Sequence, residues 1–280
     1  GSSTLLLLGA IGAGAAVAVT RGTFTNTGTN VAISVADVTS GGALTLTDVS
    51  VSSVTHSLSF AAFTGGAVAL ARGSYAASVG NAINFYSALP AGAALSLTDV
   101  SAAGWHALRL ATVAGGSVAV SGGVFTARGY GVGFAEGGVT AAAVVSIAGL
   151  KIVNAPSGGI YFNQVNGSSG VAITASVMEG NVAFLQPVDG AAISIDNITV
   201  AGAAIARAIR FVDVSNGAVV NVTNSVLDAT TSGVEFGAAV SQGSRITLAG
   251  IRVTEPVTEA VTLTGPFADS FVLACDFLPK

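Results

Sequence analysis

Apolar residues return along this chain in a short pattern: a small residue, an aliphatic residue, any residue, and then a bulky apolar one. The pattern is clearest at 82–85, 159–162 and 208–211. Its last position forms one column of bulky residues: Val35, Phe60, Phe85, Leu110, Phe134, Phe162, Phe184, Phe211, Phe236 and Leu263. Nine steps lead from residue 35 to residue 263, about 25 residues per step. A fixed period of this size predicts a solenoid of stacked repeats.

Two further apolar patterns accompany this column. Before it, aliphatic and small residues alternate, as in Val17-Ala18-Val19, which indicates a strand with one buried face. After it comes a third apolar position and a glycine-rich turn, as at Val38 and Gly41-Gly42. Three strands per repeat predict an all-β fold, a right-handed parallel β-helix of about 11 rungs of about 25 residues. A β-sandwich is the alternative, and the constant three-column period argues against it.

The repeat runs almost from end to end, so we predict a single β-helix domain over residues 1–280. Residues 1–15 would form a partial first rung and residues 271–280 a partial last one. Leu5-Leu6-Leu7 stands 28 residues before Ile33-Ser34-Val35, so we expect the same strand one rung earlier rather than the core of a signal peptide. Neither end carries a polar cap, which favours a piece of a longer chain over copies that join end to end.

Composition narrows the classes of function. Hydrophobic residues make up 51% and charged residues 9% of the chain, which excludes intrinsic disorder. No apolar run reaches the roughly 20 residues of a membrane span. The net charge is −4 and the ten basic residues are scattered singly, so we expect no nucleic-acid partner. The single cysteine, Cys275, excludes an internal disulfide framework and is expected to be a buried thiol.

The outward positions of the alternating strands are almost all small and neutral. They form two ranks, Ala18, Thr45, Ala69, Ser96, Ala119, Ser146, Ala172, Ser194, Asn221, Thr247 and Thr20, Thr47, Ala71, Thr98, Ser121, Ala148, Thr174, Asp196, Thr223, Ala249. Such a face can be plain solvent-exposed surface, or it can pack on another sheet, carry O-linked sugar or bind ice. Ice binding would call for a more regular threonine rank.

Charged side chains give few candidates for chemistry. We expect Arg210 to lie one rung from Glu235, and Asp48, Arg72 and Asp99 to follow one another in the turn column. Surface ion pairs are the plain interpretation of both groups.

Two histidines and one arginine stand apart. His56 and His106 are expected two rungs and about 10 Å apart, too far to share a metal, so we interpret them as solvent-facing or turn residues. Arg109 has no acidic neighbour at Asn84 or Gly133 in its outward column. We therefore predict no catalytic, cofactor-binding or metal site.

Loops that differ in length between rungs often mark the binding face of a solenoid. Here these are 155–158, 203–206 and 255–258, and we take their edge as the candidate contact surface.

Three sequons predict N-glycosylation at Asn166, Asn197 and Asn221. Asn166 lies in a glycine turn and Asn221 should point outward from its strand. Asn197 is expected beside Asn224 of the next rung, where stacked asparagines can instead form a ladder of hydrogen bonds.

Some phrases carry a resemblance to known proteins: Asn224-Ser225-Val226-Leu227, Gly123-Val124-Phe125 and the run 195–200, each followed by an Ala-Ile-x-Phe type of strand. They resemble the rungs of pectin-lyase-type β-helices and, more narrowly, those of the dispersed-gene-family surface proteins of trypanosomes. The resemblance covers 16–278 and rests on periodicity and composition. It implies a secreted or surface-exposed, adhesin-like protein and carries over no catalytic residue.

These observations favour a non-enzymatic structural or adhesive solenoid, secreted or on the cell surface, such as a filament or surface-coat subunit. Its expected partners are copies of itself, end to end or laterally, and glycans. A polysaccharide-binding or polysaccharide-cleaving β-helix is the first alternative, and an ice-binding protein is the second.

Overall fold

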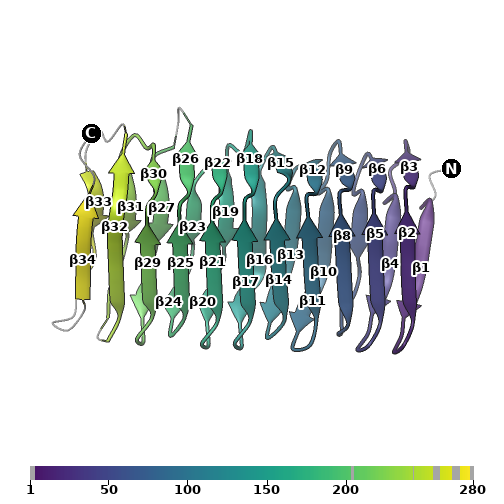
Figure 1. Cartoon of the computed structure of the whole chain (residues 1–280), viewed down its shortest axis with the longest axis horizontal. Helices are drawn as coiled ribbons and strands as arrows, with labels where there is room; N and C mark the ends of the chain where they lie inside the picture. The colour runs from purple at the N-terminus through teal and green to yellow at the C-terminus, as the bar shows by residue number, and fades with distance from the viewer. Residues whose placement is uncertain (1–3, 203–204, 242, 255–258, 267–271, 278–280) are drawn as a thin grey trace.

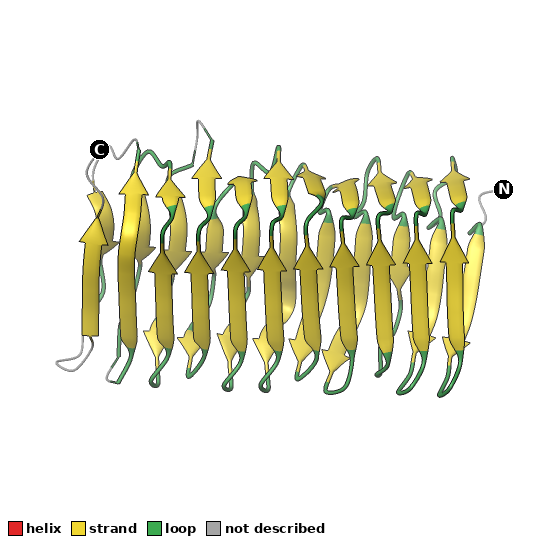
Figure 2. Cartoon of the chain, in the orientation of Figure 1, coloured by secondary structure: helices red, strands yellow, loops and turns green. Residues whose placement is uncertain are grey.

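The computed structural model is a rod of stacked rungs in which every strand runs across the long axis (Figure 1). It describes residues 4–202, 205–241, 243–254, 259–266 and 272–277. In that part of the chain there are strands and turns but no helix (Figure 2), and the parallel strands wind through about ten turns. The predicted right-handed parallel β-helix is confirmed at this level of detail, with about ten turns in place of the 11 rungs expected.

Each rung contributes one strand to each of three parallel sheets, which we call A, B and C. Sheet B contains the alternating strands: β2 (Ala16–Thr20), β5 (Ala43–Thr47), β8 (Ala67–Ala71), β11 (Ala94–Thr98), β14 (Ser117–Ser121), β17 (Val144–Ala148), β21 (Gly170–Thr174), β25 (Ala192–Asp196), β29 (Val219–Thr223), β32 (Arg245–Val253) and β34 (Val272–Phe277). Sheet C follows each of them with a short strand: β3 (Thr23–Asn26), β6 (Ser50–Ser53), β9 (Ser74–Ala77), β12 (Ser101–Gly104), β15 (Val124–Ala127), β18 (Lys151–Val153), β22 (Val177–Glu179), β26 (Thr199–Ala201) and β30 (Val226–Leu227), which pairs with the end of β32.

Sheet A contains the strands of the bulky column: β1 (Leu6–Ile11), β4 (Ile33–Val38), β7 (Leu58–Phe60), β10 (Ile83–Pro90), β13 (Leu108–Ala114), β16 (Tyr130–Thr140), β19 (Gly158–Phe162), β23 (Val182–Phe184), β27 (Arg207–Phe211), β31 (Ser232–Phe236) and β33 (Glu259–Leu263). Three short strands continue its far edge: β20 (Val165–Asn166), β24 (Val188–Asp189) and β28 (Val214–Ser215).

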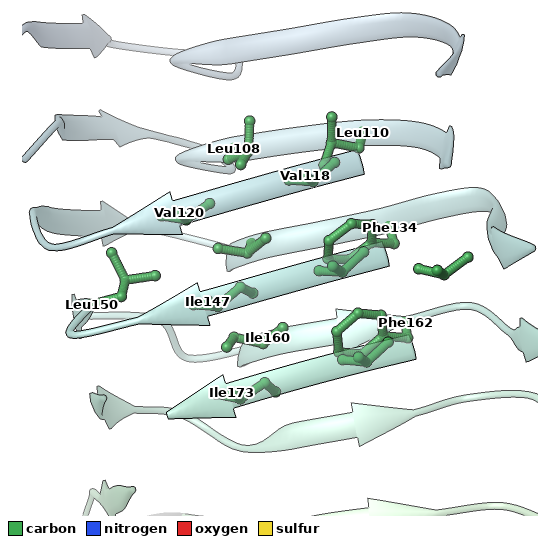
Figure 3. Packing of buried hydrophobic residues seen from close by; sticks show 14 of the residues in the cluster. Leu108, Leu110, Val118, Val120, Phe134, Ile147, Leu150, Ile160, Phe162 and Ile173 are labelled. Carbon is green, nitrogen blue, oxygen red and sulfur yellow. The ribbon is translucent and has the colours of Figure 1, made fainter. Parts of the chain in front are cut away.

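The bulky column is the spine of the core, as predicted. Its members pair in register from Val35 to Leu263. Phe162 stacks on Phe134 with ring centroids 4.6 Å apart and on Phe184 at 4.9 Å, and the rings of both pairs are nearly parallel. Figure 3 shows Phe134 and Phe162 one above the other between the sheets. Because a rung cannot bury its own apolar face, this contact between neighbours holds the rod together.

The corner between sheets B and C requires a left-handed backbone in each rung. φ lies between 48° and 68° at Arg21, Asp48, Arg72, Asp99, Gly122, Gly149, Ala175, Asn197, Asn224 and Gly250. This conformation suits glycine and is tolerated by Asn and Asp, but it is unfavourable for alanine and arginine. The stacking of the rungs therefore decides the backbone at this corner, whichever residue occupies it.

The two outward ranks of sheet B are also confirmed, because every predicted neighbour is paired in register. Cys275 pairs with Leu248 in the same sheet, and the predicted burial of its thiol lies outside what the structure describes.

The first strand differs from the prediction by one residue. Leu7 pairs with Ser34, a separation of 27 residues rather than 28. Leu6 and Leu8 therefore pack against the core, and Leu7 is 72% exposed. Consecutive leucines contain no alternation of apolar and polar positions, so the sequence alone could not fix their register.

Candidate functional site

Most of the tyrosine, histidine and tryptophan side chains gather on and beside the outer face of sheet A. The sequence holds four tyrosines, two histidines and one tryptophan. Tyr75 is buried in the core, and all the others take part in two neighbouring sets of ring contacts. We call the following residues the aromatic cluster: His56, Tyr86, Trp105, His106, Tyr130 and Tyr161.

The larger set of contacts surrounds Tyr161, an outward residue of β19. Its ring centroid lies 4.1 Å from that of Tyr130 and 6.3 Å from that of His106, which in turn lies 6.5 Å from Trp105. The ring has room because the preceding rung places Gly133 beneath it, where a Cβ atom would lie 2.2 Å from Cε1 of Tyr161. Burial raises the pKa of Tyr161, so its phenol stays protonated, while Trp105 remains half exposed.

The smaller set joins His56 to Tyr86, whose rings meet edge to face at 6.1 Å. Asn84 lies between His56 and Tyr86 in the sequence and points outward from sheet A. Its side chain is nevertheless fully buried. Three buried polar atoms here have no hydrogen-bond partner: Oγ1 of Thr55, Nδ2 of Asn84 and Oγ of Ser87. Unpaired buried polar atoms are rare in native proteins, and two of these three belong to residues that adjoin His56 and Tyr86 in sequence.

Arg109 lies between the two sets. One guanidinium nitrogen donates to Oε1 of Glu136 at 3.1 Å, and another lies 3.5 Å from Oδ1 of Asn84. Asn84 and Gly133 indeed offer no acidic partner, but Glu136 supplies one from a bulge in β16. Residues 110 and 112 of β13 pair there with residues 134 and 138, so β16 is longer at this point. The irregular rung therefore delivers a carboxylate that periodicity did not predict.

A line of turn residues beside the cluster connects successive rungs. The N–H of Asn81 donates to Nδ1 of His56 at 2.9 Å, that of His106 to Oδ1 of Asn81 at 3.3 Å, and that of Tyr130 to Nδ1 of His106 at 3.1 Å. We call His56, Asn81 and His106 the turn ladder. The prediction of solvent-facing or turn histidines is confirmed for the turn, and the stacked turns partly bury both residues. Burial lowers the pKa of both histidines, and the charge of Arg109 acts in the same direction.

A groove of about 990 Å³ lies over sheet C. Outward residues of that sheet such as Ala103 and Thr126 form its floor, and Arg128, the loop 154–158 and Arg207 line its walls. This is the edge that the variable loops indicated as a contact surface. Residues 155–158 and 205–206 line the groove, whereas 203–204 and 255–258 lie outside the described residues. Its role in contact stays a prediction.

The predicted ion pair of Arg210 with Glu235 is confirmed on sheet A. Nε of Arg210 lies 3.3 Å from Oε1 of Glu235, outside hydrogen-bond geometry. Arg207 donates to the other carboxylate oxygen of Glu235, which is almost buried. One carboxylate therefore pairs with two guanidinium groups, which leaves this set of charges with one net positive charge.

The turn column also behaves as expected. Nε of Arg72 donates to Oδ1 of Asp48 at 2.9 Å, and both side chains are exposed. This hydrogen bond is the main cause of a lowered pKa at Asp48 and of a raised pKa at Arg72. The negative charge of Asp99 also raises the pKa of Arg72.

The three sequon asparagines lie on different surfaces. Asn166 ends β20, Asn197 occupies the left-handed corner with φ of 52°, and Asn221 points outward from β29 between Ser194 and Thr247. Asn224 follows Asn197 at the same corner, as expected, but its amide donates to Asp196 at 2.9 Å. Glycosylation at these positions stays a prediction.

Comparison with known proteins finds no match: no family, no curated protein and no solved structure is recognisably similar to this chain. The parallel β-solenoid is therefore shown by the structure, while the narrower resemblance to trypanosome surface proteins stays a prediction. Within the described residues no helix is long and apolar enough to cross a membrane. In the same part of the chain, no three His, Cys, Asp or Glu side chains come together as metal ligands would.

Proposed function

We propose that this chain is a non-enzymatic adhesive β-solenoid, secreted or on the cell surface, that holds a glycan at the aromatic cluster. The observation that carries the proposal is the concentration of tyrosine, tryptophan and histidine on one stretch of sheet A. The rest of the outer surface of the rungs is made mainly of small residues, as the ranks of sheet B show.

The chemistry of the cluster suits a sugar. A pyranose ring offers an apolar face and a rim of hydroxyl groups. Trp105 and Tyr86 are each 50% exposed and present flat apolar surface with a polar end. Arg109 and Glu136 stand among the rings and can exchange their mutual hydrogen bond for hydroxyl groups. A few placed polar groups on an aromatic surface are typical of small-molecule sites.

Binding is favoured over cleavage because of the state of Glu136. Glycoside hydrolysis usually needs two carboxyl groups about 5–9.5 Å apart, one of which acts as an acid. Glu136 is the carboxylate that stands among these rings, and it is 62% exposed and already paired with Arg109. A polysaccharide-cleaving enzyme remains the alternative function.

The test is glycan binding by the whole chain, first on an array and then by titration calorimetry of the best oligosaccharide. Trp105→Ala and Tyr161→Ala should weaken binding by about tenfold or more, as buried aromatic anchors do. Val144→Ala is the matched control, because Val144 is equally exposed on sheet B, and it should bind as the parent does.

Two results would reject the proposal. One is an array without any bound glycan, and the other is a glycan whose affinity ignores both aromatic variants. New reducing ends or unsaturated products after incubation with the bound polysaccharide would replace it with the enzymatic alternative.

A further inference from the structure

The turn ladder combines two kinds of acceptor in one structural position. His56, Asn81 and His106 follow one another at steps of 25 residues, and each accepts the backbone N–H of the next rung. An N–H can only donate, so Nδ1 of each neutral imidazole carries the lone pair and Nε2 carries the proton. Asn81 keeps its acceptor at any ordinary pH, whereas a protonated histidine loses it.

His106 is the member whose protonation should matter most. Its Nδ1 holds the N–H of Tyr130, and its ring packs against Tyr130 at 5.7 Å and Tyr161 at 6.3 Å. A protonated His56 could still donate to the carbonyl oxygen of Asn81, 3.2 Å from Nδ1, so its loss would be smaller.

The groups that face these imidazoles oppose a positive charge on balance. Arg109 from β13 acts on both histidines and lowers the pKa of each, after the larger effect of burial. Glu136 offsets part of this charge but is exposed and already paired with Arg109. Tyr130 and Tyr161 beside His106, and Tyr86 beside His56, contribute neutral rings.

The effect of protonation would be local. The backbone N–H of Trp105 donates to the carbonyl oxygen of Gly80, and the backbone N–H of Gly129 donates to the carbonyl oxygen of Trp105, both at 2.7 Å. Neither bond involves an imidazole. The rung therefore stays in place while the bond that positions Tyr130 is lost.

We propose that the turn ladder makes the aromatic cluster acid-sensitive: protonation of His106, assisted by His56, releases the N–H of Tyr130, loosens the rings and discharges the bound glycan. The ligand part rests on the proposed function, whereas the loosening of the turn does not. By linkage, a glycan that binds only the neutral form must in turn hold His106 unprotonated.

Amide hydrogen exchange, read by NMR, tests the turn without any ligand. Between about pH 7.5 and pH 5, the exchange rate of the Tyr130 amide should rise up to about tenfold relative to that of the His106 amide, the worth of one hydrogen bond. The His106 amide is the internal reference, because Asn81 holds it and cannot titrate. A constant ratio across this range would overturn the proposal.

The chain also provides the matched variant, His106→Asn, which copies Asn81. Its exchange ratio should be independent of pH. The double variant His56→Asn with His106→Asn removes two members of the cluster and should bind glycan more weakly than the parent, but with the same affinity at both pH values. The parent should lose up to about tenfold in affinity at the lower pH. A pH-dependent exchange ratio with no glycan bound at any pH would reject the proposed function but keep the switch. Equal loss of affinity in parent and double variant would reject the switch but keep the glycan site.

Discussion

Sheets A and B share one register, one period and one core, yet their outer faces differ completely. Outside sheet B, residue after residue is Ala, Ser or Thr, as from Ala69 to Ser96 to Ala119. Outside sheet A, the equivalent column passes through Asn84, Arg109 and Gly133 to Tyr161. Inward positions are fixed by stacking, but outward positions are free to vary. A stretch where they depart from small neutral residues is therefore the place to which we assign the proposed glycan site.

The largest expected effect comes from the interior that both faces share. Phe162→Ala should lower the free energy of unfolding by about 3–5 kcal/mol, because it opens a cavity between two stacked rings. Chemical denaturation measures it, with Phe162→Leu as the milder control. An equal loss in the two variants would show that the column is not close-packed.

The next largest effect is a difference in stability between two glycine-to-alanine variants, one on the outer face of each sheet. Gly133→Ala should cost about 1–3 kcal/mol and displace Tyr161, because the new Cβ would overlap its ring. Gly170→Ala on sheet B has nothing within 4 Å and should be neutral or slightly stabilising. Thermal denaturation of both, with tyrosine fluorescence to follow Tyr161, checks the contrast. Equal behaviour of the two variants would mean that the cluster is loosely packed.

A smaller expected effect is that titratable groups on the two faces change the stability of the fold over different ranges of pH. His56 and His106 have folded-state pKa values below their usual value, so the unfolded chain binds protons first and stability falls as the pH drops below about 6.5. On sheet B, hydrogen bonds from Thr223 and Asn224 lower the pKa of Asp196. Its contribution is present above about pH 3.9 and is lost only on further acidification. Denaturation midpoints at closely spaced pH values should show two steps, and replacing both histidines by Asn should remove the upper one.

The smallest expected effect is on sheet B itself. Ser146→Ala and Ser194→Ala should change the free energy of unfolding by no more than about 0.5 kcal/mol, since both side chains are exposed. They should also leave glycan affinity unchanged. A large loss in either variant would show that this face is covered by another surface in solution.

Periodicity was sufficient to predict the fold, because each inward column obeys a packing rule that repeats with every rung. It failed at β1, where Leu6 and Leu7 are chemically identical and either could face the core. Variation in rung length, which is visible in sequence, drew attention to the loops 155–158 and 203–206, and the described residues among them line the groove, although their role in contact stays a prediction.

The aromatic cluster was harder to predict because it depends on irregular positions. Trp105 lies in a turn and Tyr86 in β10 just beyond the bulky column, and Glu136 reaches Arg109 only through the bulge of β16. One signal was available. His56, Asn81 and His106 are spaced by 25 residues, and acceptors repeated at that spacing predict side chains that link one rung to the next.

The left-handed corner between sheets B and C has a consequence for the length of the molecule. Arg72 and Asp99 adopt the same backbone with φ of 51°, one winding apart. Excision of residues 73–99 would therefore join two equivalent corners, and the shortened chain should close without a new turn. Insertion or deletion of whole windings can thus change the length of this protein without a change in its fold.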